Sequence, residues 1–267
     1  MNTNLTQDQI DQYQRDGALI YRGLLDQTEV EKLLESISAA IEAMGTNKVA
    51  GNADFGDAGG EDYYSNVFIQ RLNLWRVNDH IKSLFLGPEL GEMVTRLAGV
   101  EGMRVWHDQT LQKTPWANPT AWHLDNPYWS FHSRDSISIW IALDPATLAN
   151  GCMHYLPGTH KTADPERNVG IGPDFGKLFK AFPEWKGITP LVAEMQPGDC
   201  GFHNGLTAHG AGPNMTPGYR RAMTCAYMPA GSRFNGQKNI LPDDYVATLS
   251  EGDLLDNDEL NPVVWPQ

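Results

Sequence analysis

The second half of the chain is dominated by short stretches in which apolar and polar residues alternate, and this period of two constrains the fold more than any other feature. Such stretches occur at MRVWHDQTLQ, SISIWIAL, CMHYLP, LVAEM, CGFHNGLTAH and YRRAMTCAYM. Turn-forming sequences such as ANG, PGTH, QPGD and GAGPN separate them. This arrangement is typical of antiparallel sandwiches and barrels. The sequence therefore predicts an all-β core.

Two stretches before residue 45 have features of helices. Thr6 and Gln9 have capping-box spacing, and Gly17 is placed to end the helix that they begin. Thr28 and Glu31 have the same spacing and predict the start of a second helix. Its apolar residues recur at intervals of three and four and predict one buried face: Val30, Leu33, Leu34, Ile37, Ile41 and Met44. We therefore expect N-terminal α-helices beside the β core.

The composition narrows the class of protein. No repeat or linker interrupts the 267 residues, so residues 1–267 are expected to form a single domain. The formal net charge of −13 repels phosphates and anionic lipids, which disfavours nucleic acid and membrane partners. No apolar stretch could span a bilayer and the N-terminus lacks a secretory signal, so we expect a soluble, cytoplasmic protein. The sequence does not indicate an oligomeric state.

Two segments without regular patterning are candidates for a lid. Residues 45–72 are rich in Gly, Asn and Asp, and residues 161–187 form a Pro- and Gly-bearing insertion with a short helical piece near Phe175 to Phe182. Long loops in compact domains tend to be functional. Both segments are therefore expected to lie over a binding site. The cysteines Cys152, Cys200 and Cys225 are odd in number and lack CxxC spacing, so they are expected to be reduced core residues.

A metal site is predicted by two residues of the stretch AWHLDNPYW. His123 and Asp125 lie two apart in a β-prone segment, so their side chains leave the same face of the strand. Alone, the pair is equally compatible with a structural His–Asp contact. A further histidine would complete the two-histidine, one-carboxylate triad that suits iron(II). His203 and His209 both have the position to supply it.

Two adjacent arginines follow the last of these histidines. A hairpin between the strand that ends at His209 and the next strand would bring Arg220 close to the metal. Alternation places one of Arg220 and Arg221 inward and the other outward. An inward guanidinium can hold the distal carboxylate of a dicarboxylic keto acid with two parallel hydrogen bonds. Two surface charges are the alternative interpretation.

Three segments together resemble the phytanoyl-CoA dioxygenase family: AWHLDNPYW, SIWIALDPATLANGCMHYLPGTHK and HGAGPNMTPGYRRAM. The family pattern is a His-X-Asp pair, an NGC…PGTHK stretch and a distal His followed eleven residues later by Arg. The opening LTQDQIDQYQRDGALIYRGLLDQTEVEKL also looks like that family's N-terminus, so the resemblance covers nearly the whole chain. It implies a double-stranded β-helix, or jelly roll, with helices outside and iron(II) at one open end.

The resemblance also implies roles for individual residues. His123, Asp125 and His209 match the metal ligands, and Arg220 matches the arginine that binds 2-oxoglutarate. Lys113 and Trp140 are expected to line the co-substrate site. Many relatives have Gln where this chain has Leu124, and many have Ser where it has Ala211. The hydroxyl lost at Ala211 leaves Thr207 or a water to bond the co-substrate.

The implied reaction consumes O2 and 2-oxoglutarate, releases succinate and CO2, and hydroxylates an unactivated C–H bond of a small organic metabolite. Desaturation or ring formation by the same type of oxygenase, and a catalytically silent metal- or ligand-binding barrel, are the alternatives. A halogenase is disfavoured because there a small residue replaces the carboxylate ligand so that chloride can bind, and in this chain Asp125 occupies that position.

Substrate contacts are less constrained by the sequence. Among the aromatic residues Tyr63, Tyr64, Phe68, Tyr128, Trp129 and Phe131, we expect Tyr128 and Trp129 to line the pocket because they follow the metal-binding pair. Arg71 and Arg134 could meet an anionic substrate, although solvated surface positions are the default. The acidic balance gives no basic patch for coenzyme A phosphates, so a small polar or cationic substrate is expected. Structural roles are expected for His107, His132, His154, His160 and, unless it is a ligand, His203.

Overall fold

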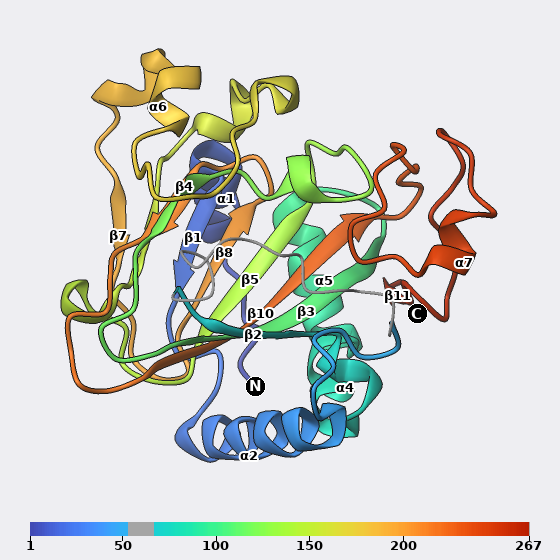
Figure 1. The fold of residues 1–267 in the computed structure, drawn as a ribbon, viewed down its shortest axis with the longest axis horizontal. Coiled ribbons are helices and arrows are strands. Elements are labelled where there is room, and N and C mark those ends of the chain that lie inside the picture. Colours follow the sequence, from blue (N-terminus) through green and yellow to red (C-terminus); the bar gives the residue numbers. More distant parts are fainter. Residues whose placement is uncertain (53–66, 267) are drawn as a thin grey trace.

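The computed structural model describes residues 1–52 and 67–266, in which two antiparallel sheets are flanked by helices (Figure 1). The larger sheet has the order β1-β8-β5-β10-β3-β11, and β2 also pairs with β3. Its strands are β1 (Ala18–Tyr21), β2 (Ile69–Leu72), β3 (Met103–Lys113), β5 (Ile137–Ala142), β8 (Cys200–Asn204), β10 (Arg220–Pro229) and β11 (Val263–Trp265). The smaller sheet has the order β4-β9-β6-β7. Its strands are β4 (Thr120–His123), β6 (Met153–Tyr155), β7 (Leu191–Ala193) and β9 (His209–Ala211).

The central strand β5 explains how the larger sheet divides the core. Ile137, Ile139 and Ile141 point to one face and pack with the helices. Trp140 and Ala142 point to the other face and pack with residues of the smaller sheet. All of β5 is buried because both faces are covered. Of the β5 residues, only the even-numbered ones therefore point their side chains into the space between the two sheets.

The N-terminal helices confirm one predicted start and correct the other. Thr6 and Gln9 form the capping box of α1 (Gln7–Asp16), and Gly17 ends that helix in the left-handed conformation with φ of 71°. The prediction that Thr28 begins the second helix is wrong. In α2 (Gln27–Met44), the side chain of Asp26 accepts from the backbone N–H of Glu29 in a reciprocal capping box. Asp is favoured over Thr at the N-cap position, and with Asp26 as the cap Thr28 lies inside the first turn.

Two further helices between the N-terminal region and the β core were not predicted. These are α4 (Asp79–Phe85) and α5 (Pro88–Ala98). The side chain of Asn78 caps the first, and Gly99 ends the second in the left-handed conformation. Their apolar residues join the core under the larger sheet, where Leu90 and Leu97 lie in the same cluster as Val105. The helices thus seal the face of the sheet that does not form the cavity.

The alternating stretches of the sequence all contain strands, but their bounds differ. CGFHNGLTAH divides between β8 and the first residue of β9, whereas β1, β2 and β11 were not predicted. The insertion carries the predicted helical piece as α6 (Leu178–Ala181). The remaining short helices are η1 (Leu74–Arg76), η2 (Asn126–Tyr128), η3 (Leu148–Asn150), η4 (Thr159–Lys161), η5 (Pro165–Arg167), η6 (Pro183–Gly187) and α7 (Asp243–Val246).

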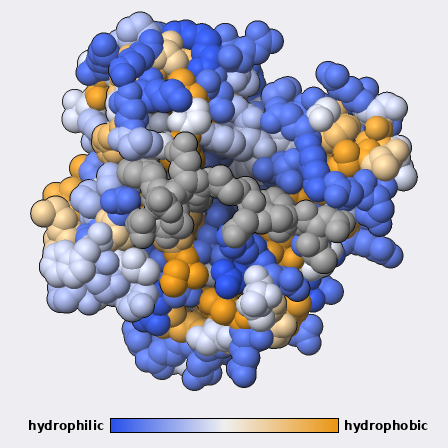
Figure 2. Space-filling model, viewed as in Figure 1, coloured by the Kyte–Doolittle hydropathy of each residue, from blue (hydrophilic) through white to orange (hydrophobic). Residues whose placement is uncertain are grey.

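The surface in the same view is mainly hydrophilic, with smaller hydrophobic areas between (Figure 2). Within residues 1–52 and 67–266, no helix is both long and apolar enough to cross a bilayer. The three cysteines are free and buried, as predicted.

Candidate functional site

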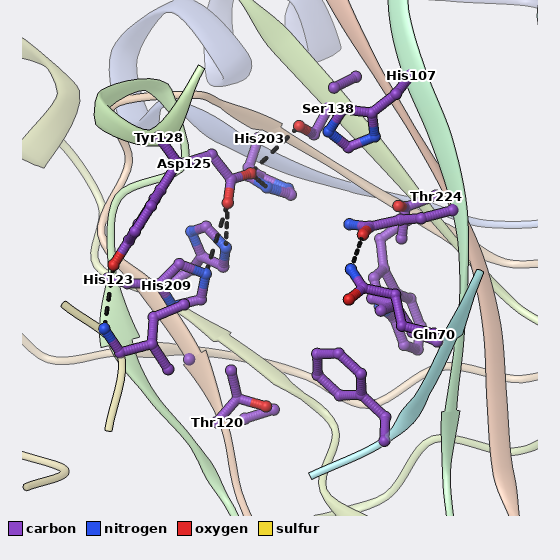
Figure 3. Close-up of a pocket in the computed structure, with 18 of the residues that line it drawn as sticks. Gln70, His107, Thr120, His123, Asp125, Tyr128, Ser138, His203, His209 and Thr224 are labelled. Carbon is purple, nitrogen blue, oxygen red and sulfur yellow. Dashed lines mark hydrogen bonds and ion pairs between the residues drawn. The ribbon is translucent and has the colours of Figure 1, made fainter. Parts of the chain in front are cut away.

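A cavity of about 680 Å³ opens between the two sheets. The smaller sheet contributes His123 and His209 to its lining, and the larger sheet contributes His107 and Arg220. Figure 3 shows Asp125 with His123, His203 and His209 on one side, and Gln70 and Thr224 across the open space. Residues that lie far apart in the sequence thus meet around one cavity.

His123, Asp125 and His209 are brought together by strand pairing. His123 ends β4 and lies directly opposite His209, the first residue of β9. Asp125 follows two residues later, at the start of η2. Nε2 of His123 and Nε2 of His209 each lie 3.5 Å from Oδ1 of Asp125. The three ligand atoms are all within 4.8 Å of one another, so one ion could contact all of them.

Backbone hydrogen bonds fix the protonation of both histidine rings. Nδ1 of His123 lies 2.8 Å from the carbonyl of Ala121, and Nδ1 of His209 lies 2.9 Å from the carbonyl of Thr207. Because a carbonyl can only accept, each Nδ1 donates its hydrogen there. The lone pair is left on Nε2, which faces Asp125. This is the usual second contact of a metal-binding histidine, which orients the ring and fixes its tautomer.

His203 occupies a different position from His209, although both were open as ligands. Its Nε2 lies 3.1 Å from Oδ2 of Asp125, the oxygen that does not face the other two histidines. Ser138 also donates to Oδ2 at 3.3 Å. The Nδ1 of His203 is buried without a hydrogen-bond partner among the described residues. His203 is therefore placed to orient the carboxylate rather than to join the triad.

Electrostatics favour a charged Asp125 carboxylate beside a neutral His209 imidazole. Burial alone would raise the pKa of Asp125, but His209, His123 and His203 together hold it well below its usual range. Burial and the neighbouring His123 lower the pKa of His209 well below its usual value. Both shifts leave the groups in the protonation states that a cation requires, because a metal ligand must be deprotonated.

Arg220 and Trp140 form a second part of the cavity lining. Both have N–H groups that donate no hydrogen bond to a described residue. Arg220 is 2% exposed, and its Cζ lies 5.1 Å from the centroid of the Trp140 ring. Nε and Nη1 of Arg220 and Nε1 of Trp140 are buried without hydrogen-bond partners among the described residues. Burial lowers the pKa of Arg220 to about 10. A buried cation with free donors is costly unless an anion binds it.

Lys113 adds a second cation beside Arg220, its partner in the β3–β10 register. It is fully buried, and its Nζ donates to the carbonyl of Asn118 at 2.6 Å. Burial, and then Arg220, lower the pKa of Lys113 to about 7. No carboxylate within residues 1–52 and 67–266 forms an ion pair with either cation. The pair therefore suits an acidic ligand.

The predicted hairpin between the strands of His209 and Arg220 is wrong. β9 pairs with β4 and β6 in the smaller sheet, whereas β10 pairs with β3 and β5 in the larger one. Residues 212–219 cross from one sheet to the other, and Arg220 reaches the cavity from the opposite side. The predicted alternation is correct, because Arg221 points outward and forms a two-point ion pair with Asp144, at 2.7 and 2.8 Å.

The hydroxyl of Thr207 is directed away from the predicted contact with a co-substrate. It donates to the carbonyl of Gly17 at 2.7 Å, and Thr207 is not part of the cavity lining. Thr120 lines the cavity instead, opposite Ala211 in the β4–β9 register. Thr120 was not predicted, because a register shift between Thr120 and His123 breaks the alternation of β4. Leu124 is buried in an apolar cluster.

Of the predicted substrate residues, Tyr128, Trp129 and Phe68 line the cavity. Phe131 lies in the core beside Trp106, and Tyr63 and Tyr64 lie outside the described residues. The two arginines expected at an anionic substrate do not line the cavity. Gln70 and Leu72 on either side of Arg71 face the cavity, so Arg71 leaves the other face of β2. Arg134 is directed at the carbonyls of His160 and Ala163, at 3.4 Å each.

The insertion of 161–187 contacts the metal-binding loop through Tyr128. The Tyr128 hydroxyl donates to the carbonyl of Val169 at 3.1 Å and accepts from the backbone N–H of Ile171 at 3.0 Å. Gly170, Ile171 and Gly172 line the cavity. The described part of the other predicted lid, residues 45–52 and 67–72, contributes Phe68, Gln70 and Leu72 to the lining. Both segments therefore border the cavity.

Comparison with known proteins gives consistent matches. A family model described as phytanoyl-CoA dioxygenase matches residues 13–222. A protein named Dioxygenase lolE1 from Epichloe uncinata is 33% identical over 55% of this chain and 54% of its own length. A probable phytanoyl-CoA dioxygenase from Caenorhabditis elegans is 35% identical over 39% of this chain and 35% of its own. The chain thus spans about half or less of these curated relatives.

A solved structure matches over nearly the full length of both chains. It is the non-haem alpha-ketoglutarate-dependent carbocyclase SnoK from nogalamycin biosynthesis, with 26% identity and a TM-score of 0.80. The match covers 97% of this chain and 96% of that one. The fold is therefore shared from end to end.

Proposed function

Because this chain belongs to the phytanoyl-CoA dioxygenase family, we propose that it is an iron(II)- and 2-oxoglutarate-dependent oxygenase that oxidises a small organic molecule. One observation carries the proposal. The same cavity holds a preformed cluster of two histidines and a carboxylate and, across from it, a buried arginine with unused donors. A metal site alone would not need that arginine.

His123, Asp125 and His209 would hold the iron. Their donor set suits iron(II), and three protein ligands leave positions open for other molecules. Iron(II) bound there supplies the activation of O2, with oxoglutarate giving up two electrons as it becomes succinate and CO2. His203 and Ser138 keep Oδ1 of Asp125 turned toward the two ligand histidines by occupying Oδ2.

Arg220 would bind the distal carboxylate of oxoglutarate. Its planar guanidinium can make two parallel hydrogen bonds to a carboxylate, and two of its nitrogens, Nε and Nη1, have no partner among the described residues. Trp140 packs over the guanidinium and keeps water from it. Lys113 adds positive charge from behind, since it lies beside Arg220 in the sheet. Many relatives have a serine hydroxyl at the position of Ala211. Thr120, which lies opposite Ala211 in the smaller sheet, could supply a hydroxyl in its place.

The two facing sheets support assignment of the fold as a double-stranded β-helix, or jelly roll. In that arrangement the metal-binding histidines come from the smaller sheet, and Arg220 and Trp140 come from the larger one. The reaction centre is then enclosed by both sheets, which excludes bulk water from reactive species. The insertion of 161–187 closes one side of the cavity through Tyr128.

Hydroxylation is the outcome we propose first. Halogenation is disfavoured because Asp125 occupies the ligand position that a halide would need. In that reaction one oxygen atom of O2 enters the C–H bond and the other enters succinate. The similarity to a carbocyclase makes ring closure the second candidate. The two differ in the mass of the product, which gains one oxygen in hydroxylation and loses two hydrogens in ring closure.

Metal binding and oxoglutarate turnover test the proposal together. Anaerobic calorimetry should show one iron(II) per chain for the parent, and the iron-loaded protein should form succinate in air. His209→Ala should abolish both, whereas His154→Ala, which changes a half-buried histidine of β6, should change neither. Parent-like iron affinity and succinate formation in His209→Ala would refute the assignment. Incubation with a metabolite extract then reports the product mass.

A further inference from the structure

The part of the cavity that is left for a substrate has no Asp, Glu, Lys or Arg among the described lining residues. Asp125 and Arg220 are the charged residues of the lining, and the proposed function assigns them to iron and oxoglutarate. The other lining residues from the described chain include no further Asp, Glu, Lys or Arg. The chemistry of the remaining walls therefore shows which substrate they can accept.

One wall is polar and lies across from the metal site. Gln70 on β2 and Gln109 on β3 are neighbours, and Gln70 Nε2 donates to Gln109 Oε1. This bond leaves the carbonyl oxygen of Gln70 and the amide hydrogens of Gln109 for another partner. Thr224 on β10 lies beside them (Figure 3). The wall thus presents acceptors and donors together.

Two lining residues hold polar atoms that no described residue satisfies. Nδ1 of His107 and Oδ1 of Asn239 are buried without hydrogen-bond partners. His107 is 7% exposed and projects from β3 toward Ser138 (Figure 3). Burial lowers the pKa of His107 to about 4, so its ring is neutral near pH 7. Buried polar atoms are rarely left unpaired, so both are expected to bond a ligand.

The adjoining wall is apolar and continuous. Leu72, Trp129, Ala226 and Ile240 belong to a single core cluster and all line the cavity. Phe68 lies in the lining as well. Side chains of this kind bury the body of a ligand, while a few placed polar groups fix its orientation.

From these walls we propose that the substrate is an uncharged molecule with an apolar body and hydroxyl or amide groups. Its polar groups meet Gln70, Gln109 and Asn239, and its body packs on Trp129 and Ile240. A group that both donates and accepts satisfies the amide pair and the carbonyl of Asn239 together. The inference rests on the proposed function, because it assigns Asp125 and Arg220 to other ligands.

Charged substrates, including coenzyme A thioesters, fit this cavity poorly. Arg71 and Arg134, which were the arginines expected at an anionic substrate, do not line it. Residues 53–66, which lie outside the described chain, contain no Lys or Arg in their sequence. A phosphate or carboxylate would therefore lose its hydration without gaining a cation. The sequence of 53–66 does contain acidic residues, so a cationic probe belongs in the test.

The test compares probes that share one aromatic body and differ in charge: 2-naphthamide, 2-naphthoate, 2-naphthylmethylammonium and 2-naphthoyl-coenzyme A. Equilibrium dialysis is performed anaerobically on the protein loaded with iron(II) and oxoglutarate. We expect the amide to bind at least about tenfold more tightly than any charged probe, because each charge loses hydration without a partner. Preferential binding of the thioester, the carboxylate or the ammonium, or no binding of the amide, would overturn the proposal.

A matched pair of variants on β3 tests the polar wall itself. Gln109→Leu removes an amide that faces the cavity, whereas Gln112→Leu removes one from the other face of the same strand. Affinity for 2-naphthamide should fall about fivefold to a hundredfold in the first and stay unchanged in the second. Asn239→Ala, in a loop, should act like Gln109→Leu and serves if that variant does not fold. Equal affinity in all three would contradict the proposal.

The same samples separate this inference from the proposed function. Iron(II) and oxoglutarate affinities are measured on each before the probe is added. If both ligands bind and a charged probe is preferred, the substrate class is wrong and the oxygenase assignment stands. If neither binds to the parent, the oxygenase assignment itself fails.

Discussion

Nε2 of His203 lies 3.1 Å from Oδ2 of Asp125, while Oδ1 of the same carboxylate faces His123 and His209 at 3.5 Å each. One carboxylate thus has its two oxygens in different roles. The oxygen near the histidine pair is available to a cation, and the other is held by His203 and Ser138. The orientation of the carboxylate is therefore set by the protein before any metal binds.

The first prediction concerns His203 as a positioning residue. His203→Ala should weaken iron(II) binding about tenfold to a hundredfold, which is the usual effect of losing a partner of a metal ligand. His203→Gln, which keeps an N–H donor, should recover part of the affinity. Anaerobic calorimetry measures both, and His154→Ala is the control. Parent-like affinity in His203→Ala would show that Asp125 is oriented without it.

The metal site shows what the sequence could predict. His123 and Asp125 were identified because residues two apart in a strand share a face. In the structure β4 ends at His123 and Asp125 has helical backbone angles at the start of η2, so the two side chains meet through a turn and not along one strand. The residues alone left His203 and His209 open, since both lie near the ends of strands. The structure separates them by their second nitrogen, because Nδ1 of His209 donates to the carbonyl of Thr207 whereas Nδ1 of His203 has no described partner. Such contacts depend on ring orientation, which spacing does not determine.

Pairing between distant segments explains most of what was not predicted. The alternation within β10 correctly placed Arg220 inward and Arg221 outward, but not the sheet to which β10 belongs. That depends on partners in β3 and β5, far away in the sequence. The amide pair of Gln70 and Gln109 is another case, because β2 was read as part of a loop. A four-residue strand has too little pattern to be recognised before its partner is known.

The second prediction separates Arg220 from its neighbour. Arg220→Ala should weaken oxoglutarate binding by about 2 to 5 kcal/mol, roughly thirtyfold to several thousandfold, because a desolvated carboxylate loses its partner. Arg221→Ala should leave it unchanged, since Arg221 is bound to Asp144 on the outer face. Arg220→Lys should fall between, because it keeps the charge and loses the planar fork. Calorimetry on the iron-loaded protein measures all three.

Iron binding is the control for this series, because Arg220 does not contact the metal cluster. It should survive in every variant. If Arg221→Ala were the variant that lost oxoglutarate, the inward and outward assignments would be reversed. If neither change mattered, the co-substrate would not be oxoglutarate.

The third prediction concerns the hydroxyl of Tyr128, which joins the metal-binding loop to the insertion. Tyr128→Phe removes the two hydrogen bonds to Val169 and Ile171. Each is worth on the order of 1 kcal/mol, so the insertion should open more often. Limited proteolysis should cleave within 161–187 several-fold faster, while the exposed control Tyr219→Phe should cleave at the parent rate. An unchanged rate in Tyr128→Phe would show that other contacts hold the insertion.

The last prediction uses the pKa of Lys113, which burial and Arg220 lower to about 7. Between about pH 7 and 9 most Lys113 side chains are neutral in the ligand-free protein, so a carboxylate bound nearby should raise the pKa and draw in a proton. Calorimetry of oxoglutarate binding in buffers of different ionisation enthalpy should therefore show proton uptake at about pH 8. The uptake should nearly vanish at about pH 6, where Lys113 is already charged.

The pH dependence of the stability of the ligand-free protein tests the protonation of Lys113 independently. The unfolded lysine binds its proton below its usual pKa near 10.5, whereas the folded one binds it only below about 7. The unfolded state therefore holds more protons between these values, so this contribution to stability is present at high pH and lost as pH falls toward 7. Lys113→Met should remove both the proton uptake and this part of the pH dependence of unfolding. Undiminished uptake in Lys113→Met would assign the proton to another group and place Lys113 outside the oxoglutarate site.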